Sequence, residues 1–146
     1  MKVFTARSTI RSPVALVWSV LSDVRTWPSW TPTVSRVEAL VPLATGARVL
    51  MVQPRLRSNV WHVSDWNPPQ SFVWTTGGWG YRILALHMLT PSTRGCEVVL
   101  RLAFEGFLSP LLARMWGSTA DRYIREEADR LKVHCEALAS SSGDSR

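Results

Sequence analysis

Apolar and polar residues alternate in short segments along the middle of the chain, between residues 34 and 105. An alternation with a period of two is typical of strands that bury one face. Glycine, proline and asparagine separate these segments and keep the connections short, so neighbouring strands are expected to pair antiparallel. Together with a weaker alternation at residues 2–11, the pattern predicts seven strands. The other six are residues 34–40, 47–53, 59–66, 71–76, 81–90 and 97–105.

Two short helical segments are expected directly after the first strand. Ser12 is a candidate N-cap, because Pro13 fits the first helical position and apolar residues follow at helical spacing. Asp23 offers a second cap for a brief helical turn, and Pro28 and Pro32 prevent a long continuation. We therefore expect one short amphipathic helix and one turn before the strands begin.

The period of the pattern changes to 3.6 residues after the last strand. Ser109 is a candidate cap with Pro110 at the first helical position, and an apolar stripe then continues to Leu138. This predicts one long C-terminal helix. The serine-rich residues 140–146 contain nothing to bury and are expected to form a frayed, disordered tail.

The order of these elements predicts a single α+β domain over residues 1–139. A chain of 146 residues with 46% hydrophobic residues has the size of one domain and is too apolar for disorder. The apolar face of the sheet must be covered, and the long helix is the main element that can cover it. A strongly curved sheet around one helix leaves an internal space, which suits an apolar ligand.

Several motifs along the chain resemble those of one known superfamily. They include Ile10-Arg11-Ser12-Pro13, Trp27-Pro28-x-Trp30-x-Pro32-x-Val34, Trp61-x-Val63-x-x-Trp66-x-Pro68-Pro69, Phe72-x-Trp74, His87-x-Leu89-x-Pro91 and Glu105-Gly106-Phe107-Leu108. The chain thereby resembles the START-like polyketide cyclase and lipid-transfer (SRPBCC) superfamily over about residues 3–138. The resemblance implies a helix-grip fold: a seven-stranded curved antiparallel sheet wrapped around a long C-terminal helix, with an internal cavity. Across that family the cavity holds lipids, sterols, polyketides, plant hormones or quinones, and some members are cyclases or dehydratases.

Eight tryptophans provide the first candidates for a cavity wall. Wide aromatic surfaces suit a flat or isoprenoid ligand and do not require a particular pattern of hydrogen bonds. Three of them, Trp18, Trp27 and Trp30, lie beside the short helices and are interpreted as structural. The cavity candidates are Trp61, Trp74, Trp79 and Trp116.

The parity of the strands decides which polar groups reach the cavity. Residues 97–105 place Val98, Leu100, Leu102 and Phe104 on the buried face. Residues 81–89 allow two registers, because both of their faces are largely apolar. The resemblance favours the register with Tyr81, Ile83, Ala85, His87 and Leu89 inward. The long helix would add Tyr123, and Glu127 is a further polar residue considered on that helix. The predicted ligand-binding set is Trp61, Trp74, Trp79, Tyr81, His87, Met115, Trp116 and Tyr123.

The chain carries none of the common catalytic or phosphate-binding motifs, such as G-x-S-x-G, H-E-x-x-H or G-x-x-x-x-G-K-[ST]. His62, His87 and His134 lie on different predicted elements, so neither a metal site nor a cofactor is expected. The main hypothesis is a carrier or sensor that binds a hydrophobic small molecule, such as a lipid, polyketide, quinone or sterol-like compound. The alternative is a cyclase or dehydratase in which Tyr81 and His87 act as acid and base, although no third residue to orient the histidine is evident.

The net charge of +6 raises the hypothesis of a nucleic-acid partner. The arginines are spread singly along the chain, so we expect no nucleic-acid partner. An adaptor that works through its arginines is a third hypothesis, which predicts a steep loss of affinity with added salt.

No apolar run approaches the roughly 18 to 20 residues that a membrane span needs, and the first residues lack the apolar core of a signal peptide. We therefore expect a cytoplasmic protein without integral membrane association, as a monomer or weak homodimer.

Overall fold

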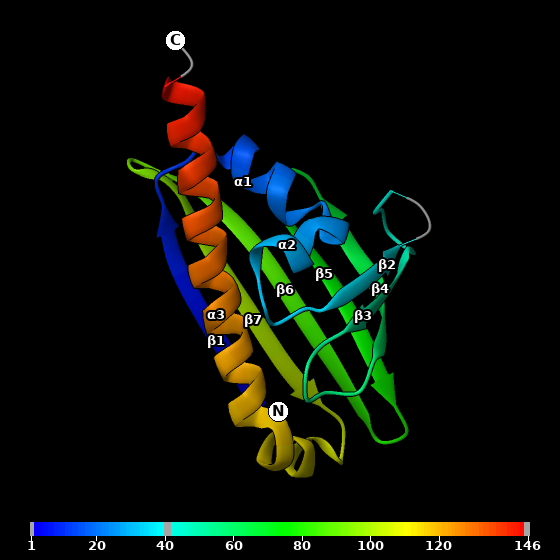
Figure 1. Cartoon of the computed structure of the whole chain (residues 1–146). Coiled ribbons are helices and arrows are strands. Elements are labelled where there is room, and N and C mark those ends of the chain that lie inside the picture. The colour runs from blue at the N-terminus through cyan, green and yellow to red at the C-terminus, as the bar shows by residue number, and fades with distance from the viewer. Residues whose placement is uncertain (1, 40–41, 145–146) are drawn as a thin grey trace.

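Seven antiparallel strands form one curved sheet in the computed structural model, which describes residues 2–39 and 42–144 (Figure 1). The spatial order is β1-β7-β6-β5-β4-β3-β2, so each strand from β2 onward pairs with the next one in sequence, while β1 pairs with β7. The strands are β1 (Lys2–Ile10), β2 (Arg36–Ala39), β3 (Arg48–Val52), β4 (Asn59–Asn67), β5 (Ser71–Gly78), β6 (Tyr81–Ser92) and β7 (Gly95–Glu105). All seven predicted strands are confirmed, with ends that move by one or two residues. Leu40, the predicted end of the second strand, lies outside the described residues.

The helices lie on one face of this sheet (Figure 1). The long helix α3 (Ser109–Asp144) packs along β1 and β7. The short elements α1 (Val14–Leu21), η1 (Val24–Thr26) and α2 (Trp27–Trp30) lie beside α3, over the end of the sheet that is uppermost in Figure 1. The α+β helix-grip architecture predicted from the sequence is confirmed.

The predicted caps of the short helices are wrong. Neither α1 nor η1 has a side-chain cap, and the Ser12 hydroxyl instead donates a hydrogen bond to the carbonyl of Cys135 on α3, at 3.0 Å. The neighbouring backbone N–H of Arg11 donates to a carboxylate oxygen of Glu136, at 2.9 Å. These bonds join the end of β1 to α3 across more than a hundred residues of sequence, a contact that local spacing does not reveal.

The long helix also extends beyond its predicted end. It continues to Asp144, through most of the segment 140–146 that the sequence analysis assigns to a frayed tail. An existing helix gains one backbone hydrogen bond for each residue that joins it, and serine opposes that gain only weakly. Residues 145–146 of the predicted tail lie outside the described residues.

The buried face of the sheet follows the predicted parity. Val98, Leu100 and Phe104 of β7 are buried. On β6 the register with His87 inward is confirmed, because Ala85, His87 and Leu89 are buried while Arg82 is exposed. The main core therefore lies between this face and the helices, and the candidate site lies within it.

Candidate functional site: a cavity between the sheet and the long helix

A cavity of about 300 Å³ lies between the sheet and α3. Its wall is formed by residues of α2, of strands β3 to β7 and of the first half of α3. The volume lies at the lower end of the range for small-molecule sites, and the wall is mostly apolar, as such sites are.

Six of the eight predicted ligand-binding residues line this cavity. They are Trp61, Trp74, Tyr81, His87, Trp116 and Tyr123. They come from four different elements, β4, β5, β6 and α3, and the fold brings them together. Glu127, which the sequence analysis considered beside them, also lines the cavity.

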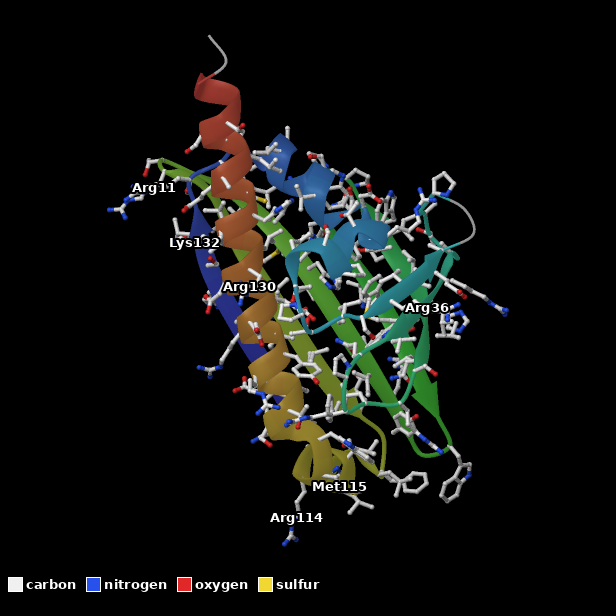
Figure 2. All side chains as sticks on the ribbon, in the orientation of Figure 1. Arg11, Arg36, Arg114, Met115, Arg130 and Lys132 are labelled. Atoms are coloured by element: carbon white, nitrogen blue, oxygen red, sulfur yellow. The ribbon has the colours of Figure 1, made fainter. Side chains whose placement is uncertain are left out.

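Trp79 and Met115 do not line the cavity, and the prediction that places them there is wrong. Trp79 lies in the turn between β5 and β6, beyond the regular alternation, and is 81% exposed. Met115 lies on the outer side of α3 and is more than half exposed; Figure 2 shows it pointing away from the sheet at the end of the molecule. Successive helix positions differ by about 100°, which places Met115 roughly 100° from the direction that faces the cavity.

Several residues outside the predicted set also line the cavity. Trp27 of α2, interpreted as structural, forms part of the wall and is 2% exposed. Gln53 and Asn59 line the cavity at the connection between β3 and β4. Strand parity was the available signal, because Gln53 is two positions after the buried Met51, and Asn59 is two positions before the buried Trp61.

His87 lies at the inner end of the cavity, within a cluster of aromatic rings. Its ring stacks on Phe72 with centroids 4.2 Å apart and meets Trp74 edge to face at 5.1 Å. Trp27 lies 5.7 Å from the same ring. Burial in this cluster lowers the pKa of His87 to about 3, an effect that a hydrogen bond to the Phe72 carbonyl opposes only in part. The imidazole is therefore neutral at physiological pH.

The tautomer of His87 follows from its one hydrogen bond. Nδ1 lies 3.4 Å from the backbone carbonyl oxygen of Phe72, and a carbonyl oxygen only accepts. Nδ1 therefore carries the proton, and Nε2 holds a lone pair. The Phe72 carbonyl is thus the group that orients the histidine, which the sequence analysis did not find.

Glu127 is a second buried polar group in the wall, contributed by α3. One carboxylate oxygen, Oε1, accepts a hydrogen bond from the Thr33 hydroxyl at 3.0 Å, and that hydroxyl lies 2.8 Å from the Thr31 hydroxyl. Burial raises the pKa of Glu127 to about 7; the Thr33 hydrogen bond lowers it and the nearby Glu126 raises it further. The cavity therefore contains a carboxyl group that exchanges its proton near neutral pH.

The outer end of the cavity is formed by the β3–β4 connection and the first turns of α3. Leu56 and Arg57 line it from the connection, and Leu112 and Trp116 line it from the helix. Arg57 and Trp116 are exposed, so the cavity reaches the surface at this end. The Tyr123 hydroxyl donates a hydrogen bond to the Pro54 carbonyl and thereby joins the connection to α3.

Within residues 2–39 and 42–144, no group of three His, Cys, Asp or Glu residues is arranged to hold a metal ion. No helix in that part of the chain has the length and apolar character needed to cross a membrane.

Solved structures with the same fold are similar to this chain at low sequence identity. The Zhui aromatase/cyclase from Streptomyces sp. R1128 has a TM-score of 0.79 and 16% identity, with 97% of this chain and 98% of that chain covered. TTHA0849 from Thermus thermophilus has a TM-score of 0.74 and 17% identity, with 96% and 99% covered. The di-domain aromatase/cyclase StfQ of the steffimycin biosynthetic pathway has a TM-score of 0.75 and 13% identity; 94% of this chain covers 51% of StfQ. At these identities the likeness concerns the fold, and the chain spans about half the length of StfQ.

No curated protein matches the chain by sequence. The family comparison covers nearly the whole domain, because the match extends over residues 1–136 and includes every strand and the residues of α3 that line the cavity. The chain belongs to the polyketide cyclase / dehydrase and lipid transport family.

Proposed function

We propose that the protein binds a hydrophobic small molecule with one polar end in this cavity, as a carrier or sensor. The observation that carries the proposal is a cavity of about 300 Å³ whose wall is mainly aromatic and aliphatic. Burial of apolar ligand surface contributes about 25 cal/mol per Å², before the costs of association are subtracted. A lipid, polyketide, quinone or sterol-like compound has the required apolar body.

The polar groups of the wall favour a particular polar end. His87 offers the lone pair of Nε2, because its Nδ1 proton is directed to the Phe72 carbonyl. Glu127 offers the oxygen that does not accept from Thr33. Both groups can accept a hydrogen bond from a ligand hydroxyl, so we propose an alcohol or phenol at the inner end.

A second candidate function is acid–base catalysis of the cyclase or dehydratase type, and Glu127 is the observation that favours it. The sequence hypothesis assigned acid and base roles to Tyr81 and His87, but a histidine with a pKa of about 3 is a weak base at neutral pH. A carboxyl group with a pKa of about 7 is matched to proton transfer there. In a dehydration, a base removes a proton from carbon and an acid protonates the departing hydroxyl, and Glu127 suits either step.

Titration with 2-naphthol, followed by tryptophan fluorescence, tests the binding proposal. Trp61, Trp74 and Trp116 line the cavity and report occupancy. Ala120 lines the cavity as well, so the larger ring in Ala120→Phe fills the space and leaves every other wall residue unchanged. We expect saturable binding by the wild-type protein and at least about a tenfold weaker affinity for Ala120→Phe, since the ring displaces the ligand.

Ala137→Phe is the matched control, because Ala137 is exposed on the same helix. It should bind 2-naphthol as the wild-type protein does. Equal affinity of wild type and Ala120→Phe would place binding elsewhere and refute the proposal.

The mass of the compound recovered from the protein distinguishes catalysis from binding alone. If Glu127 catalyses dehydration, a hydroxylated substrate recovered from Glu127→Gln should be heavier, by one water, than the compound recovered from wild type. Identical masses from both proteins support binding without chemistry.

A further inference from the structure

Five large apolar side chains gather at the outer end of the cavity without being buried. Trp79 and Phe107 contact each other edge to face with ring centroids 5.0 Å apart. Leu111 and Met115 lie one turn apart on α3 and are each more than half exposed, and Trp116, which also lines the cavity, is 37% exposed. We call Trp79, Phe107, Leu111, Met115 and Trp116 the apolar rim.

The backbone holds the parts of the apolar rim together. The Leu108 N–H, in the link between β7 and α3, donates to the Gly80 carbonyl of the β5–β6 turn at 2.9 Å. Gly106 makes this approach possible, because its φ is +99° and a Cβ at this position would collide with that carbonyl. The exposed rings of Trp79 and Phe107 are therefore held in place on adjoining turns.

Arginines outnumber acidic residues in the segments that build the rim end of the molecule. The segments that build this end, residues 53–59, 77–82 and 105–118, contain four arginines and one glutamate. That glutamate, Glu105, pairs with Arg82 at 2.9 Å. Arg55, Arg57 and Arg114 take part in none of the ion pairs of residues 2–39 and 42–144. Figure 2 shows Arg114 extending from the same end of the molecule as Met115.

The geometry points to the apolar rim as a docking surface for an anionic lipid bilayer. Exposed apolar patches of this kind mark interaction surfaces, and aromatic residues bordered by arginines fit the boundary between acyl chains and anionic headgroups. The rim consists of exposed side chains from the β5–β6 turn, the link between β7 and α3, and the first turns of α3. A fluid bilayer can surround these exposed side chains whatever their relative positions, whereas a protein partner must be complementary to them in shape. Docking at this end places the opening of the cavity against the bilayer, where an apolar ligand passes without crossing water.

Vesicle co-sedimentation with the full chain tests this proposal, using phosphatidylcholine alone or mixed with phosphatidylglycerol. We expect binding to the anionic vesicles, weaker binding in high salt or to phosphatidylcholine alone, and a blue shift of tryptophan emission as Trp79 leaves water. The double variant Trp79→Ala/Phe107→Ala should lose about tenfold in partitioning, because both rings are removed from the interface. Both side chains are exposed, so its melting temperature should stay close to that of wild type.

Matched variants elsewhere on α3 provide the controls. Val133 is 64% exposed and distant from the rim in sequence, so Val133→Ser should bind vesicles as wild type does. Arg114→Gln should weaken binding about fivefold, the value of one cation near an anionic surface. Arg130→Gln should not, because Arg130 lies along the side of the helix, away from Arg114 (Figure 2).

Three outcomes would overturn the proposal. The first is the absence of binding to either kind of vesicle, and the second is equal loss in the rim variants and their controls. The third is a rim variant that binds vesicles as wild type does. Such a variant would change only the self-association of the protein or its binding to an acidic protein, both measured by size-exclusion chromatography. Each outcome is independent of whether the cavity binds 2-naphthol.

Discussion

The two ends of the cavity contain the same residue types in opposite surroundings. At the inner end, Trp27, Trp74 and Phe72 enclose the ring of His87 and are each no more than 2% exposed. At the outer end, Trp79 and Phe107 contact each other and remain largely in solvent. The same aromatic chemistry fixes the shape and polarity of the wall at one end and leaves apolar surface available at the other.

The difference also concerns charge. The inner end contains a neutral histidine and a carboxyl group that is ionised in part near pH 7, so it carries no positive charge. The outer end carries arginines that stay charged at any physiological pH. The inner end therefore selects what the cavity accepts, whereas the outer end governs what the protein approaches.

The largest expected difference is in the free energy of unfolding, when one tryptophan from each end is replaced by alanine. Trp74→Ala should lower the free energy of unfolding by about 3 to 5 kcal/mol, because the ring packs against Trp61, Phe72 and His87. Trp79→Ala should change it by less than about 0.5 kcal/mol. Urea denaturation measures both. Similar losses for the two variants would show that the ends are not distinct.

A smaller effect depends on pH and isolates Glu127. The pKa of its carboxyl is raised to about 7 in the folded protein, so the associated stability is complete below the ordinary value of 4.5 and is lost as pH rises through 7. Glu127→Gln keeps the shape and an oxygen for Thr33 but does not titrate. Relative to wild type, this variant should gain about 2 kcal/mol between pH 5.5 and 8, by the relation of pKa to stability. A difference that is constant with pH would contradict the burial of this carboxyl.

The smallest effect concerns the junction between the two ends. Tyr123→Phe removes the hydrogen bond to the Pro54 carbonyl and should cost about 1 kcal/mol. Amide hydrogen exchange should become faster in residues 53–58, because the β3–β4 connection loses its bond to α3. Unchanged exchange there, with the same loss of stability, would show that the bond does not hold the connection.

The strands and the long helix could be predicted because their patterns are local. The inward register of β7 follows from the alternation of Val98, Leu100, Leu102 and Phe104 with polar residues. On β6 both faces are largely apolar, so the residues alone left two registers open, and the family resemblance favoured the one that places His87 inward. The cavity was predicted from the fold class alone, because no local residue pattern indicates it.

The candidate site was harder to predict, since exposure depends on contacts between distant segments. Trp79 is as apolar as Trp74, but it follows Gly77 and Gly78 into a turn where no facing element covers it. Trp27 looked structural because nothing in the sequence shows that α2 faces the cavity. The position of Ser12 in the sequence is typical of an N-cap, but its hydroxyl donates a hydrogen bond to a carbonyl of α3 instead.

Native mass spectrometry of the protein, purified from the cells that make it, shows whether the cavity holds a compound. We expect one apolar compound bound per chain, retained by Ala137→Phe and lost from Ala120→Phe, in which a ring fills the cavity. A wild-type protein without any bound compound, or an Ala120→Phe variant that retains it, would contradict the assignment of this cavity as the binding site.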